Sequence, residues 1–158
     1  MSRSFLLPPV DTVTFGTGAF DTIEAAVRKA GGTRVVAILS SSLAGRPVEE
    51  KLRENLGPAL VGTYAKAAQH VPRGSVLEAL EVARSASADC IVSVGGGTPI
   101  DCAKAVALGL GTRVTEAEDL DPYRVQVPYP DTPGGPEIDR GGGPPIPGPT
   151  TPSGGGRN

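Results

Sequence analysis

The residues best suited to bind a ligand form a glycine turn between an apolar run and a helical pattern. The run Cys90–Val94 has the length and composition of a buried strand, and three glycines follow it at once. Thr98 is expected as the N-cap of a helix and Pro99 at its first position. Such a turn lets the backbone approach an anion, and the helix offers free N–H groups and the positive end of its dipole. The sequence therefore predicts a phosphate site, formed by Gly95, Gly96, Gly97 and Thr98.

The glycines by themselves leave two interpretations open. The G-x-x-x-x-G-K-[ST] pattern of phosphate-binding loops does not occur, and Ile100 stands at the third small position of the G-x-G-x-x-[GA] fingerprint. One interpretation is phosphate binding. The other is a tight turn between a strand and a helix that needs only the positive φ angles of glycine.

Two charged residues follow on the same predicted helix. Lys104 lies within two turns of the helix start, so its ammonium group can face a bound phosphate or the solvent. Asp101 is the third residue after Thr98, and this spacing also permits a capping-box contact within the helix. Both residues are candidates for the site, and a purely local role is the alternative for each.

The pattern Gly95-Gly96-Gly97-Thr98-x-x-Asp101-x-Ala103-Lys104 resembles the GGG[ST]xxDxAK signature of the iron-type alcohol dehydrogenases. Maleylacetate reductases and glycerol dehydrogenases are relatives in that family. The resemblance implies that the glycine turn carries the pyrophosphate of NAD or NADP. It also implies that Asp101 and Lys104 line the same cleft.

A serine cluster follows another buried strand, Arg34–Leu39, at the end where parallel-sheet folds place ligands. By the same resemblance, many members specific for NAD have an aspartate at the position matching Ser40. Serines carry no negative charge, so they would not repel the 2′-phosphate of NADP and can donate hydrogen bonds to it. A polar turn that caps the next helix is the alternative. The candidate cofactor residues here are Ser40 and Ser41.

Two further segments carry a resemblance to the family. The stretch PPIPGPTTPS, residues 144–153, resembles a PPxxxxPTTxS segment that forms a strand and loop beside the cofactor, which implies cofactor contacts for Thr150 and Thr151. The phrase His70–Pro72 resembles a loop of maleylacetate reductases. His70 is the only histidine and cannot form a metal site alone. An ordinary loop residue and a substrate contact are the alternatives for it.

The alternation of apolar runs and helical patterns predicts an α/β fold with a parallel sheet. The resemblance makes it a Rossmann-like sheet flanked by helices, as in the N-terminal domain of dehydroquinate-synthase-like proteins. The ligand edge is expected at the carboxyl ends of the strands. The S-x-x-E sequence at Ser75 predicts a capping box. The expected strands are 12–15, 34–39, 60–64 and 90–94, and the expected helices are 19–30, 47–56, 75–86 and 98–110.

Composition divides the chain of 158 residues into a periodic part and an irregular tail. We expect an NAD(P)-binding domain at 1–122 and a Gly/Pro-rich tail at 123–158 that cannot bury enough apolar surface to order itself. The net charge of −2 makes nucleic acid and anionic membranes unexpected partners. Cys90 and Cys102 form no CxxC pair, so both are expected as reduced core residues of a cytoplasmic protein. A second copy of the chain, in a homodimer, is a further candidate partner.

The resemblance covers only the cofactor-binding half of the family. Its members hold a divalent metal, iron or zinc, with an aspartate and three histidines of a following helical domain, and this chain lacks those positions. We therefore assign no catalytic residue and no metal ligand within it. The first hypothesis is a truncated NAD(P)-dependent oxidoreductase, whose longer form would act on a small alcohol or carbonyl substrate. The alternatives are a nucleotide-binding module or inactive fragment without turnover, and an NAD-using lyase of the dehydroquinate-synthase type.

Overall fold

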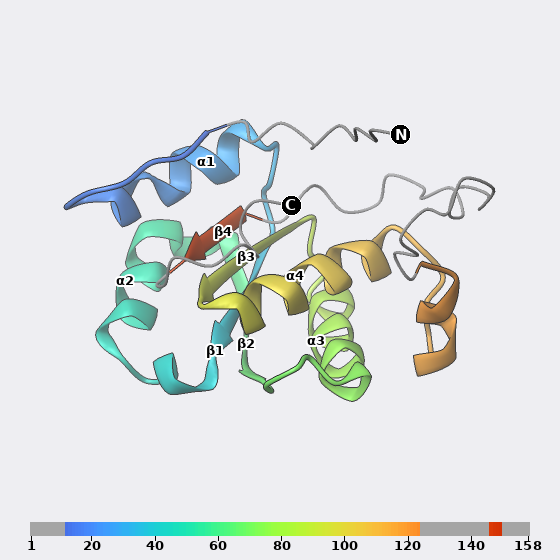
Figure 1. The fold of residues 1–158 in the computed structure, drawn as a ribbon. Helices are drawn as coiled ribbons and strands as arrows, with labels where there is room; N and C mark the ends of the chain where they lie inside the picture. Colours follow the sequence, from blue (N-terminus) through green and yellow to red (C-terminus); the bar gives the residue numbers. More distant parts are fainter. Residues whose placement is uncertain (1–11, 124–145, 150–158) are drawn as a thin grey trace, which may run out of the picture.

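A parallel sheet runs through the part of the chain that the computed structural model describes, residues 12–123 and 146–149 (Figure 1). The strand order is β2-β1-β3-β4, and each neighbouring pair is parallel. The central strands β1 and β3 are buried along nearly their whole length, as their unbroken apolar runs require in a sheet covered on both faces. The strands are β1 (Val35–Ser40), β2 (Leu60–Ala67), β3 (Cys90–Gly95) and β4 (Ile146–Pro149).

Two helices cover each face of the sheet (Figure 1). The first pair packs against one side of β1 and β3, and the second pair packs against the other side. The first pair is α1 (Ile23–Lys29) and α2 (Pro47–Leu56), and the second is α3 (Arg73–Ser85) and α4 (Gly97–Leu110). Short 3-10 helices are η1 (Ala19–Thr22), η2 (Ser41–Leu43), η3 (Gly57–Ala59) and η4 (Ala117–Tyr123). Among the described residues, no helix combines the length and apolarity needed to cross a bilayer.

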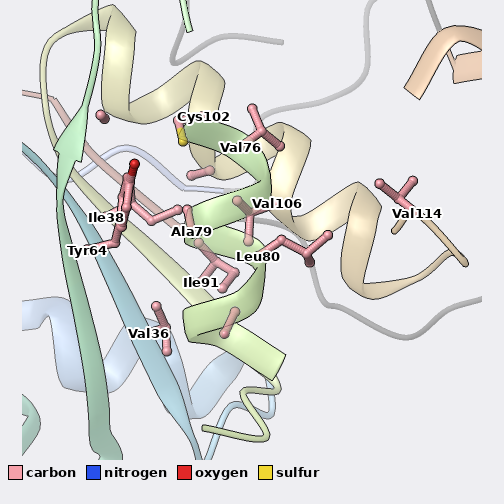
Figure 2. Close-up of a cluster of buried hydrophobic side chains, with 13 residues drawn as sticks. Val36, Ile38, Tyr64, Val76, Ala79, Leu80, Ile91, Cys102, Val106 and Val114 are labelled. Carbon is pink, nitrogen blue, oxygen red and sulfur yellow. The ribbon is translucent and has the colours of Figure 1, made fainter. Parts of the chain in front are cut away.

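The larger apolar cluster lies between the sheet and the helices α3 and α4 (Figure 2). Ile38 of β1, Leu80 of α3 and Val106 of α4 meet there and are almost fully buried. The two helices approach closely at Gly109, where an added Cβ would lie 2.7 Å from Leu80 Cδ2. The missing side chain at Gly109 lets Leu80 of α3 pack directly against α4.

Polar contacts fasten the ends of these elements. The Arg84 guanidinium donates to the carbonyl oxygens of Val114 at 2.6 Å and Gly109 at 2.9 Å, which ties α3 to the chain that leaves α4. At the amino end of the sheet, the Asp89 carboxylate accepts hydrogen bonds from the backbone N–H groups of Thr33 at 2.9 Å and Arg34 at 2.8 Å. This second contact joins the starts of β1 and β3.

Both cysteines lie in the core, as predicted. Cys90 packs on the α1 and α2 side and Cys102 on the α3 and α4 side, and both are free thiols. Burial raises the pKa of each thiol to about 11.

Two local predictions near helix and strand starts are wrong. Residues 12–15 form no strand, and Val13 and Phe15 are exposed by 72% and 89% because neither packs on the described sheet. The capping box at Ser75 does not form either. Helix α3 begins earlier, at Arg73, with Pro72 as its N-cap, and the Ser75 N–H donates to the Pro72 carbonyl at 2.9 Å.

The strand β4 lies within the segment that was predicted as an irregular tail. Its residues fall within 123–158, yet they pair with β3 from Val92 to Gly95. Pro147 and Pro149 are two positions apart, so their nitrogens face the same side of the strand. In a strand at the edge of a sheet, one side faces away from the neighbouring strand. Nitrogens on that side need no N–H group, because they pair with no strand. The two prolines are therefore compatible with a strand at this edge.

Candidate functional site

The strands β1 and β3 are neighbours whose following helices lie on opposite faces of the sheet. After β1 the chain continues to α2, and after β3 it continues to α4 (Figure 1). This arrangement is a topological switch point, where open parallel sheets leave a crevice beyond the carboxyl ends of the strands. The residues that end the two strands are Ser40 and Gly95, and both were predicted for the site.

Gly95 makes the turn at this crevice and has no room for a side chain. Its φ of 141° lies in the region that favours glycine. An added Cβ would overlap Ser40 Oγ and would lie 2.7 Å from Pro99 Cγ. The Ser40 side chain is half-buried against this glycine, whereas Ser41 is exposed at the start of η2.

The helix α4 begins at once after the turn, earlier than predicted. Gly96 is its N-cap, with φ −81° and ψ −154°, so Thr98 is the second helical residue and the predicted N-cap at Thr98 is wrong. The chain leaves the strand at Gly95, whose positive φ starts the turn into the helix. No side chain of the described part caps the first turn of α4. The first N–H groups of a helix have no partner within the helix itself, and a helix start without a side-chain cap is suited to an anion.

The position of the N-cap also decides between the alternatives for Asp101. A capping box places its acidic residue three positions after the N-cap, which here is Pro99. Asp101 lies two positions further on, so the local cap interpretation is wrong. Its side chain is 56% exposed and lies 3.8 Å from the Lys104 ammonium, which is 28% exposed. The pair puts one carboxylate and one ammonium beside the start of α4.

A pocket of about 500 Å³ opens beside these residues. One wall is the start of α4, and the other is the loop between β2 and α3, which carries the only histidine of the chain. The residues around the pocket are Gln69, His70, Val71, Gly97, Thr98 and Asp101. The structure thus brings His70 to the predicted glycine turn.

Sequence reasoning missed Gln69 and Val71 as neighbours of the site. The available signal was their place in the loop that follows a predicted strand, since the carboxyl ends of parallel strands share one edge. Thr150 and Thr151, also predicted as cofactor contacts, lie outside the described residues.

A parallel sheet with an uncapped glycine turn at its switch point defines a Rossmann-like α/β fold. The family model of the iron-containing alcohol dehydrogenases matches residues 9–153, and the chain belongs to that family. The resemblance of the glycine signature and the predicted fold class are thereby confirmed.

Individual relatives agree with this assignment. Maleylacetate reductase 2 from Cupriavidus pinatubonensis is 38% identical over 101 residues, which are 64% of this chain and 28% of that protein. The crystal structure of maleylacetate reductase from Rhizobium sp. strain MTP-10005 is 32% identical, with a TM-score of 0.59 over 68% of this chain and 31% of that chain. The archaeal alcohol dehydrogenase ADH/D1 from a Red Sea brine pool, 22% identical, shares the fold with a TM-score of 0.72 over 94% of this chain and 37% of that chain. This chain therefore spans about a third or less of the length of the two maleylacetate reductases.

The described residues do not fit the metal in the family's name. Within 12–123 and 146–149, no three His, Cys, Asp or Glu side chains are grouped to hold a metal ion. Asp119, in the acidic segment after α4, accepts hydrogen bonds from the backbone of Thr115 and Glu116, and Asp121 pairs with Arg73. We assign no reaction step to a metal held by these residues.

Proposed function

We propose that this chain is the cofactor-binding part of an NAD(P)-dependent oxidoreductase of the iron-containing alcohol dehydrogenase family. The observation that carries the proposal is the turn from β3 to α4. Gly95 starts the turn there with a positive φ, and among the described residues no side chain caps the first turn of α4 at the switch point of the sheet. When bound, the cofactor supplies the hydride chemistry between an alcohol and a carbonyl compound.

The residues around the turn have distinct roles in this proposal. The backbone N–H groups of Gly97 and Thr98 hold the diphosphate, and the Thr98 hydroxyl can donate a further hydrogen bond. The Asp101 carboxylate accepts hydrogen bonds from ribose hydroxyls. Lys104, near Asp101, adds a positive charge that offsets this carboxylate beside an anionic ligand.

The end of β1 supports binding of NADP as well as NAD. Neither Ser40 nor Ser41 carries a negative charge that would repel a 2′-phosphate. Since the Ser40 side chain packs on Gly95, the exposed Ser41 is the better placed of the two to reach the ligand. We also propose that Thr150 and Thr151 contact the cofactor, on the family resemblance alone.

We assign a substrate-binding role to none of the described residues. We propose residues 1–122 as the NAD(P)-binding domain, with a small carbonyl compound or alcohol as the substrate of a longer form that includes the metal. The maleylacetate reductases among the relatives favour reduction of the substrate over its oxidation. By itself the chain would bind nucleotide without turnover, because the described residues include no metal-binding group.

Titration of the 158-residue chain with NADP⁺ and NAD⁺ in a calorimeter tests the proposal. We expect saturable binding of both, with NADP⁺ at least as tight as NAD⁺. Gly96→Val should abolish binding, because its side chain would take the place of the phosphate, and the circular dichroism spectrum of the variant shows whether the chain is folded. Gly74→Val, at an open position of α3, is the matched control and should leave binding unchanged. A folded wild-type chain that binds neither nucleotide, or an unchanged affinity in Gly96→Val, would overturn the proposal.

A further inference from the structure

The loop between β2 and α3 has an unusual backbone at two consecutive residues. His70 has φ 63° and Val71 has φ 46°, and both angles lie in the left-handed region. This conformation is uncommon outside glycine and rare for a β-branched residue such as valine, so it persists only where the surrounding contacts fix it. The contacts on the two sides of the loop therefore decide whether it keeps this strained shape.

Hydrogen bonds fix the two ends of the loop. Before the bend, the Val71 N–H donates to the Ala68 carbonyl at 3.0 Å. After the bend, the Pro72 carbonyl accepts the N–H groups of Ser75 at 2.9 Å and Val76 at 3.3 Å, which starts α3. Because the second end of the loop is also the start of α3, a contact that fixes this helix start fixes the loop as well.

Arg73, the first residue of α3, connects this helix start to η4. Its guanidinium donates to the Ala117 carbonyl at 2.9 Å and forms an ion pair with the Asp121 carboxylate. Both acceptors belong to η4, which begins at Ala117. One side chain thus joins the end of the strained loop to an element that lies 44 residues further along the chain.

The helix η4 is itself anchored at its start and along its length. The Asp119 carboxylate accepts hydrogen bonds from the N–H groups of Thr115 at 2.7 Å and Glu116 at 3.0 Å. Leu120 and Tyr123 pack at the border of the apolar cluster between the sheet, α3 and α4, and the loop packs at the same border through its valine. The loop and η4 therefore share both an apolar support and the guanidinium between them.

We propose that η4 is a strap that holds the loop between β2 and α3 in its strained shape, with Arg73 as the fastening. When η4 leaves α3, the two contacts of the guanidinium break, and the loop relaxes towards ordinary backbone angles. This loop forms one wall of the pocket at the start of α4, and the described residues that line the pocket include none of η4. A partner that displaces η4 would thus change the pocket from a distance, and by linkage a ligand in the pocket would stabilise η4. The inference is independent of which ligand binds there.

Hydrogen exchange of the backbone amides, followed by NMR in the absence of ligand, tests the strap. In Arg73→Ala, the Val71 N–H should exchange about fivefold to tenfold faster, as expected when one or two exposed hydrogen bonds are lost. The amides of β1 and β3 should keep their protection, because the Arg73 side chain is 44% exposed and lies outside the core. Arg53→Ala is the matched control. Arg53 forms a similar exposed ion pair, 2.8 Å from Glu49, but on α2 at the other face of the sheet, so the loop should not respond.

A double variant separates a strap from a simple surface contact. In His70→Gly the positive φ carries little cost, because glycine adopts it readily. In that background, Arg73→Ala should accelerate exchange at Val71 less than it does in the wild-type background, since less strain is left to release. An equal acceleration in both backgrounds overturns the strap, and so does an unchanged rate in Arg73→Ala. The same acceleration in Arg53→Ala would also overturn it, because the loop would then respond to any loss of surface charge.

Discussion

Replacement of Gly109 by alanine tests how closely α3 and α4 must approach each other. The new Cβ would lie 2.7 Å from Leu80 Cδ2 and 3.1 Å from Leu80 Cδ1, in a core where Leu80 is 1% exposed. Overpacking of this kind costs about 1–3 kcal/mol. Against it stands a gain of up to about 1 kcal/mol, because alanine favours a helix over glycine. Since the overpacking cost exceeds the helical gain, Gly109→Ala should lower the free energy of unfolding.

Urea denaturation measures this change, and Gly74→Ala separates the helical gain from the clash. Gly74 lies in α3 with no atom within 4 Å of an added Cβ, so alanine there brings the helical gain alone. The two variants should differ by about 1–3 kcal/mol, with Gly74→Ala the more stable. In a Leu80→Ala background the clash is absent, and Gly109→Ala should then become neutral or stabilising. An equal cost of Gly109→Ala in both backgrounds would refute the close approach of the two helices.

Two further predictions concern titratable groups. Burial works to raise the pKa of the Asp89 carboxyl, but hydrogen bonds from Thr33 and Arg34 outweigh it and hold the pKa below its usual value of 3.8. A lowered pKa stabilises the fold above the unfolded value, and that stability is lost as the pH falls through the folded value. Asp89→Asn should therefore destabilise the chain at neutral pH and weaken the loss of stability on acidification. Urea melts from neutral to strongly acidic pH measure this, and an unchanged acid limb contradicts it. Because burial raises the pKa of Cys90 and Cys102 to about 11, neither thiol should react with a disulfide reagent at mildly alkaline pH until the chain is unfolded in urea. Rapid labelling of the folded chain would show that the core around them opens.

The sequence predicted the buried strands of the sheet better than a strand that would lie outside it. Unbroken apolar runs marked β1 and β3, because strands buried on both faces have no polar alternation. The strand expected at 12–15 relied on alternation alone, and in the structure its apolar residues Val13 and Phe15 stay exposed. Alternation shows that a strand is possible, but a strand also needs a partner, which a local pattern does not supply.

The sequence predicted the glycine turn of the site, but it did not predict the loop between β2 and α3 that faces this turn. The signature residues from Gly95 to Lys104 are adjacent in sequence, so one motif was enough to find them. His70 reaches the same place only through the order of the strands and the positive φ angles of its loop. Both helix caps at Thr98 and Ser75 were misplaced for a related reason. The chain turned earlier, at Gly95 and at Pro72, and side-chain preference for a cap could not show where the turn falls.

The packing of Ser40 on Gly95 has a consequence for how this site can change over evolution. Ser40 occupies the space that a side chain at position 95 would need, so what position 95 can accept depends on the residue at position 40. The two form an epistatic pair, in which the substitution open to one depends on the state of the other. An aspartate at position 40 would have to fit against the glycine turn that shapes the start of α4. The exposed Ser41 carries no such constraint, and the mutational path to a different cofactor preference is shorter there.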